Sequence, residues 1–231
     1  MIQVLLVEDD QEIARVIRYY LGEHDCYETR WADNAQKALE MLDESIDVVL
    51  LDIMLPDTDG ISLCTLMRQK TTCPIIFVSC LDDSETIIKA LEQGGDDYIT
   101  KPFDNSILDA RIRANLRRVQ LDKCGSVPHS LCFHESSLDA KNAVLSVGDK
   151  RYQLPPIEFK LLSYLMSHPK MYFKPEELYH YIWGKESYGD TRTVVVHIHN
   201  LRRKIEENPS EPHYIKRVWG KGYVFDPDHN L

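Results

Sequence analysis

The sequence has no apolar run that approaches the ~20 residues needed to cross a lipid bilayer. Its first residues lack both a basic cluster and a small-residue cleavage site, so we predict no signal peptide. With 43% hydrophobic and 28% charged residues, the 231-residue chain has the composition of a globular protein and the length of two domains. These features predict a cytoplasmic protein that contacts no membrane.

Motifs for soft metals and for disulfide frameworks are also missing. No two of the six cysteines are spaced as Cys-x-x-Cys, and several lie inside apolar runs. We therefore expect the cysteines to be small buried side chains that remain unpaired in a reducing compartment. Eight of the nine histidines lie beyond residue 121, without accompanying cysteines or a His-Glu-x-x-His pattern, which argues against a zinc site.

The net charge of −10 is unevenly distributed along the chain. Residues 1–121 contain 23 acidic and 12 basic side chains, whereas residues 122–231 contain 14 acidic and 15 basic ones. Within residues 192–221, seven basic side chains outnumber three acidic ones. An acidic first half and a locally basic second half predict two domains with different partners.

The first half alternates between strand-like and helix-like segments. Residues 48–51 (Val-Val-Leu-Leu) lack polar alternation, which is typical of a central parallel strand covered on both faces. Five alternations with short connections predict a doubly wound, five-stranded parallel α/β sheet. The expected strands are 2–7, 27–32, 46–51, 74–79 and 96–100, and the expected helices lie near 13–22, 34–42, 61–67, 84–93 and 105–121.

Chemically distinctive side chains stand where four of these strands end. Glu8 and Asp9 follow the first strand, Asp52 follows the third, Ser79 ends the fourth and Lys101 follows the fifth. Asp52 by itself is simply explained as a surface loop residue. Parallel strands, however, bring their carboxyl ends to one edge of the sheet, where ligands bind, so the five side chains are expected to meet there.

Three carboxylates at one edge repel each other unless a cation joins them. An all-oxygen site suits Mg²⁺, which can neutralise an incoming phosphoryl group. Asp52 can then act as a nucleophile that forms an aspartyl phosphate. Lys101 can pair with that phosphate, and the Ser79 hydroxyl can donate a hydrogen bond to it. The pattern therefore predicts phosphoryl transfer at this edge.

The order Glu8-Asp9, Asp52, Ser79 and Lys101-Pro102-Phe103, with Leu-Pro-Asp-Thr-Asp-Gly at 55–60, resembles the receiver domain of two-component response regulators. The resemblance implies a flavodoxin-like fold and Mg²⁺-dependent phosphoryl transfer from a sensor histidine kinase. The implied site consists of Asp52 as phospho-acceptor, Glu8, Asp9, Asp52 and the Met54 backbone carbonyl as Mg²⁺ ligands, Ser79 and Tyr98 as switch residues, and Lys101 as the phosphate-binding lysine.

Residues 84–118 carry a second pattern of charged and apolar side chains on two helices and the strand between them. Solvated amphipathic helices explain this pattern as well as an interface does. The resemblance implies a homodimer that forms on phosphorylation, with intermolecular ion pairs between Asp97 and Arg111 and between Asp96 and Arg118.

One ion pair that the resemblance implies is missing from this face. Lys89 lacks its usual glutamate partner, because that position is Ile107. We therefore expect a dimer face that is more apolar than usual.

A stretch without periodicity that contains Gly, Ser and Pro, residues 122–130, is the predicted linker between domains at 1–121 and 131–231. Short alternating runs then predict a small antiparallel sheet, followed by three helices and a β-hairpin. The expected strands are 131–133, 137–139, 143–147 and 151–153, the helices 157–165, 175–183 and 191–207, and the hairpin strands 214–218 and 222–225.

The helix at 191–207 has an apolar stripe, and its other positions are basic or hydrogen-bonding. A solvated basic surface explains those positions as well as DNA binding does. In a major groove they could hold phosphates and reach base edges. The basic tip of the hairpin, residues 219–222, could reach an adjacent minor groove.

Three helices followed by a hairpin resemble the winged helix-turn-helix effector of the OmpR/PhoB subfamily of response regulators, an α+β domain. The motifs at 192–204 and 218–225 carry this resemblance. It implies double-stranded promoter DNA and RNA polymerase as partners. The candidate DNA-binding residues are His199 and Asn200 for base readout, Arg192, Arg202, Arg203 and Lys221 for the backbone, and in addition Thr193, His197 and Lys204.

We therefore predict a regulator rather than an enzyme, in which phosphorylation of Asp52 drives dimerisation and promoter binding. One alternative is a Mg²⁺-dependent phosphohydrolase that works through an aspartyl phosphate. Such an enzyme needs an acid two residues after the nucleophile, and this chain has Met54 there. The other alternative is a phosphorylation-independent DNA-binding regulator, which we expect to have a degraded acidic site.

Overall fold

The structure is a computed structural model that describes residues 1–24, 26–121, 130–134, 136–140, 142–184 and 191–228, with the backbone alone for 117–121 and 130. The chain forms two compact units, Met1–Leu116 and Arg117–Leu231. Among the described residues, no helix is both long enough and apolar enough to span a bilayer. The predicted linker, 122–130, lies outside the described residues apart from Ser130, which begins strand β6.

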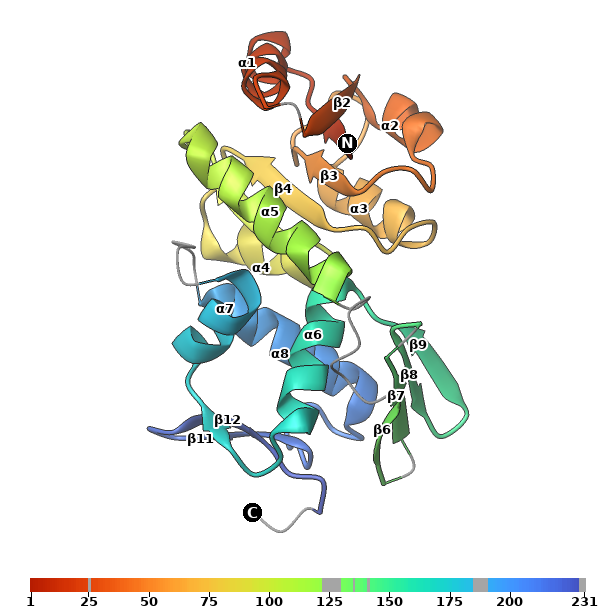
Figure 1. Cartoon of the computed structure of the whole chain (residues 1–231), viewed down its shortest axis with the longest axis vertical. Coiled ribbons are helices and arrows are strands. Elements are labelled where there is room, and N and C mark those ends of the chain that lie inside the picture. Colours follow the sequence, from red (N-terminus) through yellow and green to blue (C-terminus); the bar gives the residue numbers. More distant parts are fainter. Residues whose placement is uncertain (25, 122–129, 135, 141, 185–190, 229–231) are drawn as a thin grey trace. The chain divides into compact units, whose positions relative to one another are not determined.

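The first unit is a parallel sheet with the strand order β2-β1-β3-β4-β5 and helices on both of its faces (Figure 1). The strands are β1 Ile2–Val7, β2 Tyr27–Ala32, β3 Val48–Leu51, β4 Ile75–Ser79 and β5 Asp97–Thr100. The helices are α1 Gln11–Gly22, α2 Ala35–Met41, α3 Gly60–Arg68, α4 Ser84–Glu92 and α5 Asn105–Leu121. The chain changes its winding direction between β1 and β3, and ligands bind beyond the carboxyl ends of strands at such a point.

The central strand β3 is apolar throughout because both of its faces are covered. Val49 and Leu51 pack in the cluster that contains side chains of α2 and α3. Val48 and Leu50 pack in the cluster that contains side chains of α1 and α5. All four side chains are fully buried. Since successive residues of a strand face opposite sides, polar side chains are left to the ends of the strand.

Short polar residues begin four of these helices and thereby define the loops at the sheet edge. The side chains of Asp10, Asn34, Asp59 and Asp83 each accept a hydrogen bond from a backbone N–H in the first turn of α1, α2, α3 and α4. Such caps satisfy N–H groups that have no partner within the helix. The chain therefore turns from strand to helix within a few residues of the strand ends.

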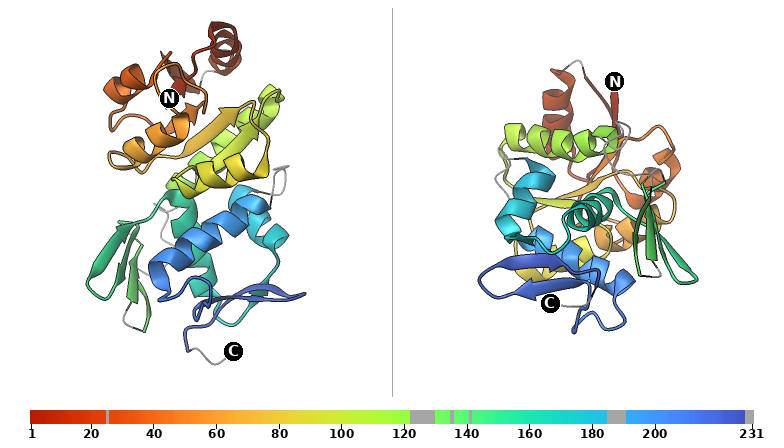
Figure 2. Two further views of the ribbon diagram at one scale, coloured as in Figure 1. Left: turned by 180° about the vertical axis from the view of Figure 1, so that it is seen from behind. Right: turned by 60° about the horizontal axis from the view of Figure 1, so that its bottom comes forward.

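The second unit begins with an antiparallel sheet in the order β6-β7-β8-β9, continues with three helices and ends in a sheet in the order β10-β12-β11 (Figures 1 and 2). Its strands are β6 Ser130–Phe133, β7 Ser136–Asp139, β8 Val144–Val147, β9 Lys150–Gln153, β10 Tyr172–Phe173, β11 Ile215–Val218 and β12 Gly222–Phe225. Its helices are α6 Pro156–Ser167, α7 Pro175–Trp183 and α8 Arg192–Ile205.

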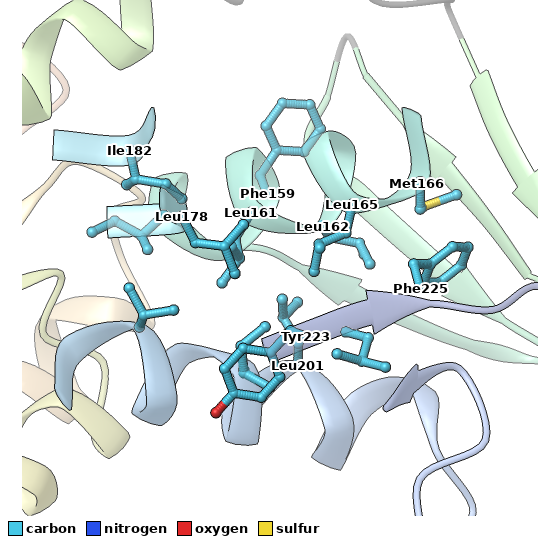
Figure 3. Packing of buried hydrophobic residues seen from close by; sticks show 14 of the residues in the cluster. Phe159, Leu161, Leu162, Leu165, Met166, Leu178, Ile182, Leu201, Tyr223 and Phe225 are labelled. Carbon is cyan, nitrogen blue, oxygen red and sulfur yellow. The ribbon is translucent and has the colours of Figure 1, made fainter. Parts of the chain in front are cut away.

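A single apolar cluster joins the three helices to β12 in this unit. Figure 3 shows Leu161, Leu162 and Leu165 of α6, Leu178 and Ile182 of α7, Leu201 of α8, and Tyr223 and Phe225 of β12 gathered together. Strand β12 also lies close to β10. A Cβ added at Gly222 would come within 2.0 Å of the carbonyl oxygen of Phe173, so this position has room only for glycine. The hairpin is therefore packed onto the helices through β12.

The predicted fold class is confirmed: a flavodoxin-like parallel sheet precedes a winged-helix domain. The element missing from the expectation is β10, whose two residues are too few to show a strand periodicity. Its pairing with β12 depends on a residue 50 positions away, since Phe173 pairs with Tyr223.

Candidate functional site

An acidic cluster lies at the carboxyl ends of β1 and β3. Glu8, Asp9 and Asp52 each place a carboxylate oxygen within 4.8 Å of the others. Glu8 and Asp52 are buried, whereas Asp9 is exposed. The sheet brings these residues together because Val7 of β1 pairs with Leu51 of β3 directly before the acidic positions. The predicted convergence of side chains at this edge is therefore present in the structure.

Lys101 reaches into this cluster from the end of β5. Its Nζ donates a hydrogen bond to Glu8 Oε2 at 2.6 Å and another to Asp52 Oδ2 at 2.6 Å. Burial by itself lowers the pKa of Lys101, but the hydrogen bonds and charges of Asp52 and Glu8 outweigh this effect and raise it. Lys101 is therefore a fixed cation between two carboxylates.

The carboxylate oxygens of this cluster fit Mg²⁺, the cation that these residue types imply. Burial raises the pKa of Glu8 to about 7. Glu8 Oε1 is buried and has no hydrogen-bond partner among the described residues, although Oε2 of the same carboxylate is held by Lys101. A buried carboxylate oxygen without a donor is costly unless something else satisfies it. Hard oxygen ligands suit Mg²⁺, which also keeps water ligands on its exposed side.

The other residues predicted for this site are Ser79, Met54 and Tyr98. Ser79 is fully buried at the end of β4, and its carbonyl accepts a hydrogen bond from the Lys101 backbone N–H at 2.8 Å. The Met54 N–H donates to Asp52 Oδ1 at 3.1 Å, while the Met54 side chain is exposed. The Tyr98 hydroxyl donates to the Leu81 carbonyl at 2.6 Å, and burial raises the pKa of Tyr98 to about 12.

The two aspartates expected to form intermolecular ion pairs are instead paired within the chain. Arg111 donates to both carboxylate oxygens of Asp97, at 2.8 and 2.9 Å, and both side chains are buried. Asp96 is fully buried, where it pairs with Arg68 and accepts a hydrogen bond from the Ile75 N–H at 2.9 Å. The intermolecular pairs stay a prediction, and they would require both aspartates to exchange the cations that they contact within the chain.

The other members of the expected dimer face have different surroundings. Lys89 and Ile107 are exposed, and so is Ile88 one position before Lys89. The side chain of Arg118 lies outside the described residues. Of the expected face, the structure therefore describes exposed apolar and basic side chains on α4 and α5.

Helix α8 presents fewer of the predicted DNA-binding residues than expected. Its exposed positions Arg192, Val195, His199 and Arg203 recur every three or four residues and so lie along one side. Thr193, His197 and Asn200 are buried. This burial does not favour direct contacts of these three side chains with DNA, and their expected role stays a prediction.

Two further basic residues of α8 are held by contacts within the second unit. Arg202 Nε donates to the Ile215 carbonyl at 2.8 Å, and its guanidinium lies over the Tyr223 ring. Burial lowers the pKa of Arg202. Lys204 pairs with the buried Glu158 of α6. Arg202 therefore connects α8 to β11, and Lys204 connects it to α6.

The tip of the β11–β12 hairpin is exposed. The Lys221 N–H donates to the Val218 carbonyl at 3.1 Å and closes the turn, and the Lys221 ammonium lies 4.7 Å from the centre of the Tyr172 ring. Trp219 is 98% exposed, and Arg217 is exposed beside it. Trp219 belongs to the hairpin tip that is expected to reach a minor groove, whereas the sequence interpretation assigned no role to Arg217.

Asp57 is another residue that sequence reasoning did not single out. Its carboxylate accepts hydrogen bonds from the N–H groups of Ala35 and Gln36, at 3.0 and 3.2 Å. No local pattern could have indicated this contact, because the partners lie on α2, about twenty positions earlier in the chain.

Both units match families with known members. The family model of the response regulator receiver domain matches residues 4–113, and that of the C-terminal domain of transcriptional regulatory proteins matches residues 149–225. The chain is 34% identical over 226 residues to the transcriptional regulatory protein YvrH of Bacillus subtilis, covering 97% of this chain and 95% of YvrH. It is 35% identical over 234 residues to the transcriptional regulatory protein SrrA of Staphylococcus aureus, covering 99% and 97% of the two chains.

Solved structures agree with these relatives. A mutant of RitR aligns with a TM-score of 0.81 and 26% identity over 98% of this chain and 99% of that one. The response regulator DrrB, a Thermotoga maritima OmpR/PhoB homologue, aligns with a TM-score of 0.52 and 30% identity over 98% and 99%. The fold and these matches define a receiver domain joined to a DNA-binding domain.

The chain belongs to the response regulators of the OmpR/PhoB type. It is a two-component response regulator with a DNA-binding domain that regulates transcription.

Proposed function

We propose that a sensor histidine kinase phosphorylates Asp52 in a Mg²⁺-dependent reaction and that this modification controls binding to promoter DNA. The single observation that carries the proposal is the position of the Lys101 ammonium, 2.6 Å from both Glu8 and Asp52 within the acidic cluster. A cation that already touches the acceptor carboxylate can receive the negative charge of a phosphoryl group without a large movement.

Each residue of the pocket has a defined part in this proposal. An Asp52 carboxylate oxygen attacks the phosphorus of the kinase phosphohistidine, the phosphorus–nitrogen bond breaks, and the histidine nitrogen leaves. Glu8, Asp9, Asp52 and the Met54 carbonyl would hold Mg²⁺, which neutralises charge on the transferred group when it is bound. Lys101 and the Ser79 hydroxyl then hold the phosphoryl oxygens, and movement of Ser79 towards them changes the surroundings of Tyr98.

The output is proposed to reside in the second unit, with residues 1–121 as the receiver and 131–231 as the DNA-binding domain. Arg192 and Arg203 would contact DNA phosphates and His199 base edges, because all three are exposed on one side of α8. Lys221 at the hairpin tip would add a backbone contact. The remaining partners are RNA polymerase and a second copy of the chain, and the cytoplasm is the compartment where all of them meet.

Dimerisation on phosphorylation is proposed to use the exposed apolar and basic surface of α4 and α5, which includes Ile88, Lys89 and Ile107. Apolar side chains can supply the core of a symmetric contact without intermolecular ion pairs. Since Asp96 and Asp97 already have internal partners, Arg118 would have to find another acceptor across this contact.

The phosphohydrolase alternative differs in the fate of the aspartyl phosphate. In a regulator the modified Asp52 persists as a signal, whereas in a hydrolase it turns over. The exposed thioether of Met54 cannot act as the general acid that rapid turnover requires. A phosphorylation-independent DNA-binding regulator, in contrast, would form no adduct.

Mass spectrometry of the intact chain after incubation with Mg²⁺ and a small phosphodonor separates these possibilities. We expect one phosphoryl adduct in the wild type and none in Asp52→Asn, which keeps the shape of the side chain. Rapid donor consumption without an adduct would indicate the hydrolase, and an unreactive chain would indicate the phosphorylation-independent regulator.

A further inference from the structure

The loop between β3 and α3 carries both Asp52 and Met54, and it is tightly closed at its base. The Gly60 N–H donates to the Ile53 carbonyl at 2.8 Å, and Met54 and Asp59 form an isolated antiparallel bridge. A Cβ added at Gly60 would lie 2.0 Å from the Asp52 carbonyl oxygen, so only glycine permits this closure. The hydrogen bond at the base uses the Ile53 carbonyl and not the Met54 carbonyl.

The outer part of the same loop is attached to α2. Asp57 Oδ1 accepts from the Ala35 N–H at 3.0 Å, and Asp57 Oδ2 accepts from the Gln36 N–H at 3.2 Å. Both oxygens of one carboxylate are therefore bound to consecutive backbone groups of a helix that lies about twenty residues earlier in the chain. The contact satisfies two first-turn N–H groups of α2 that have no acceptor within the helix.

Helix α2 is a rigid base for this attachment. Its residues Ala35 and Ala38 are buried in the cluster that also contains Val49 and Leu51 of β3. Its N-cap is supplied separately by Asn34, whose side chain accepts from the Lys37 N–H at 2.9 Å. The helix start therefore has two acceptors, of which one is local and the other comes from the loop of the acidic cluster.

We propose that Asp57 is a positioning residue for the Mg²⁺ site, because it ties the β3–α3 loop to α2 and so holds the Met54 carbonyl at the acidic cluster. This inference depends on the proposed function, in which the Met54 carbonyl is a ligand. The described loop is attached at its base through Gly60, at its outer part through Asp57, and through the partly buried Leu55, which packs against the core. Removing the Asp57 contact releases the outer part of the loop, residues 56–58, from α2, so that the neighbouring backbone with the Met54 carbonyl is held less tightly.

The affinity of a protein site for a metal ion depends on the groups that hold its ligands in position, as well as on the ligands themselves. A backbone carbonyl cannot reorient by itself, so its position depends on the whole loop. Loss of a group that orients a metal ligand weakens metal affinity by about 10-fold to 100-fold. Because Asp57 acts on one ligand of several, we expect the lower end of this range, about 10-fold.

The test is the dissociation constant for Mg²⁺ of the full-length, unphosphorylated chain, measured by isothermal titration calorimetry. We expect Asp57→Ala to bind Mg²⁺ about 10-fold more weakly than the wild type. Asp57→Asn, which keeps one acceptor oxygen for the Ala35 N–H, is expected to lie between the two. The exposed position of Asp57 means that these variants should fold, and far-ultraviolet circular dichroism checks this.

Asn34→Ala is the matched control, because it removes the other acceptor at the start of the same helix without touching the loop. A purely structural role of Asp57 in supporting α2 would make Asn34→Ala and Asp57→Ala equal in Mg²⁺ affinity, and that result would overturn the inference. So would wild-type affinity in Asp57→Ala. A wild-type chain that releases no heat with Mg²⁺ would remove the proposed metal site itself, which is a different failure.

Discussion

Arg111 holds both carboxylate oxygens of Asp97 within a single chain, at 2.8 and 2.9 Å, with side-chain exposures of 7% and 1%. Asn115 Nδ2 also approaches Asp97 Oδ2, at 3.4 Å. This buried ion pair stabilises the folded receiver. Without Arg111, Asp97 would be an unpaired charge in the protein interior, which is costly.

The first prediction concerns this pair. Arg111→Ala should lower the free energy of unfolding by about 3–5 kcal/mol, because it leaves Asp97 buried without its cation. Urea denaturation of the full chain, followed by the signal of the receiver transition, measures the change. Arg113→Ala is the control on the same helix: Arg113 pairs with Asp109 at an exposed position, so its loss should change the stability little. Equal effects of the two variants would argue against a structural role for the Arg111–Asp97 pair.

A second prediction concerns Lys101. Lys101→Met should reduce the rate of Asp52 phosphorylation by a small donor about 100-fold, because the transferred group loses a preorganised positive charge. The adduct formed per unit time, measured by mass spectrometry, gives the rate. Lys89→Met removes an exposed lysine of α4 and should leave the rate unchanged. If both variants react at the wild-type rate, the ammonium beside Asp52 has no part in the transfer.

A third prediction concerns the metal. Chelation of divalent ions should abolish formation of the phosphoryl adduct, and added Mg²⁺ should restore it.

Glu8→Gln should weaken Mg²⁺ binding, because it replaces the buried carboxylate whose Oε1 has no hydrogen-bond partner among the described residues. Calorimetric titration with Mg²⁺ checks this. A carboxylate at β2, Glu28, bonds only to Gln3 among the contacts described, so Glu28→Gln is the control and should bind as the wild type does. Undiminished binding by Glu8→Gln would exclude Glu8 as a ligand.

A fourth prediction separates neighbouring arginines of α8. Arg203→Ala should weaken DNA binding and lower the slope of log affinity against log salt concentration by about one, as expected for a lost phosphate contact. Arg202→Ala should instead lower the stability of the domain, because Arg202 supports the Ile215 carbonyl and the Tyr223 ring. Fluorescence anisotropy at several salt concentrations and thermal denaturation together distinguish them. A salt slope that falls for Arg202→Ala and stays constant for Arg203→Ala would reverse the assignment.

A fifth prediction concerns base readout by the same helix. His199→Ala should change the preferred DNA sequence, since His199 is exposed. Asn200→Ala should act mainly on stability, since Asn200 is 6% exposed. Selection from a randomised DNA library, followed by sequencing, measures the preference of each variant. An altered preference in Asn200→Ala alone would support the original expectation from the sequence.

The central pocket could be predicted because its signals are local in the sequence. An uninterrupted apolar run identifies a strand covered on both faces, and the polar residue that follows it must lie at the sheet edge. Glu8, Asp52 and Lys101 each follow such a strand, and parallel pairing of the strands is enough to bring them together. The chemistry of three carboxylates and a lysine then restricts what the edge can bind.

The dimer face and the recognition surface could not be predicted to the same depth. Whether Asp97 is exposed depends on Arg111, which approaches it only after α5 packs against the sheet. Whether Asn200 is exposed depends on neighbours outside α8. Exposure is a property of the surroundings, and residues at adjacent helical positions differ in it although their side chains are equally polar.

The sequence by itself therefore determined the two-domain class, the order of strands and helices, and the acidic edge with its lysine, because periodicity and strand ends are properties of consecutive residues. Only the tertiary structure decided that Asp96 and Asp97 are internal, that Arg202 and Lys204 brace α8, and that Asp57 binds the start of α2. Each of these depends on a partner that packing brings close, and the partner cannot be identified from the residues that neighbour it in the sequence.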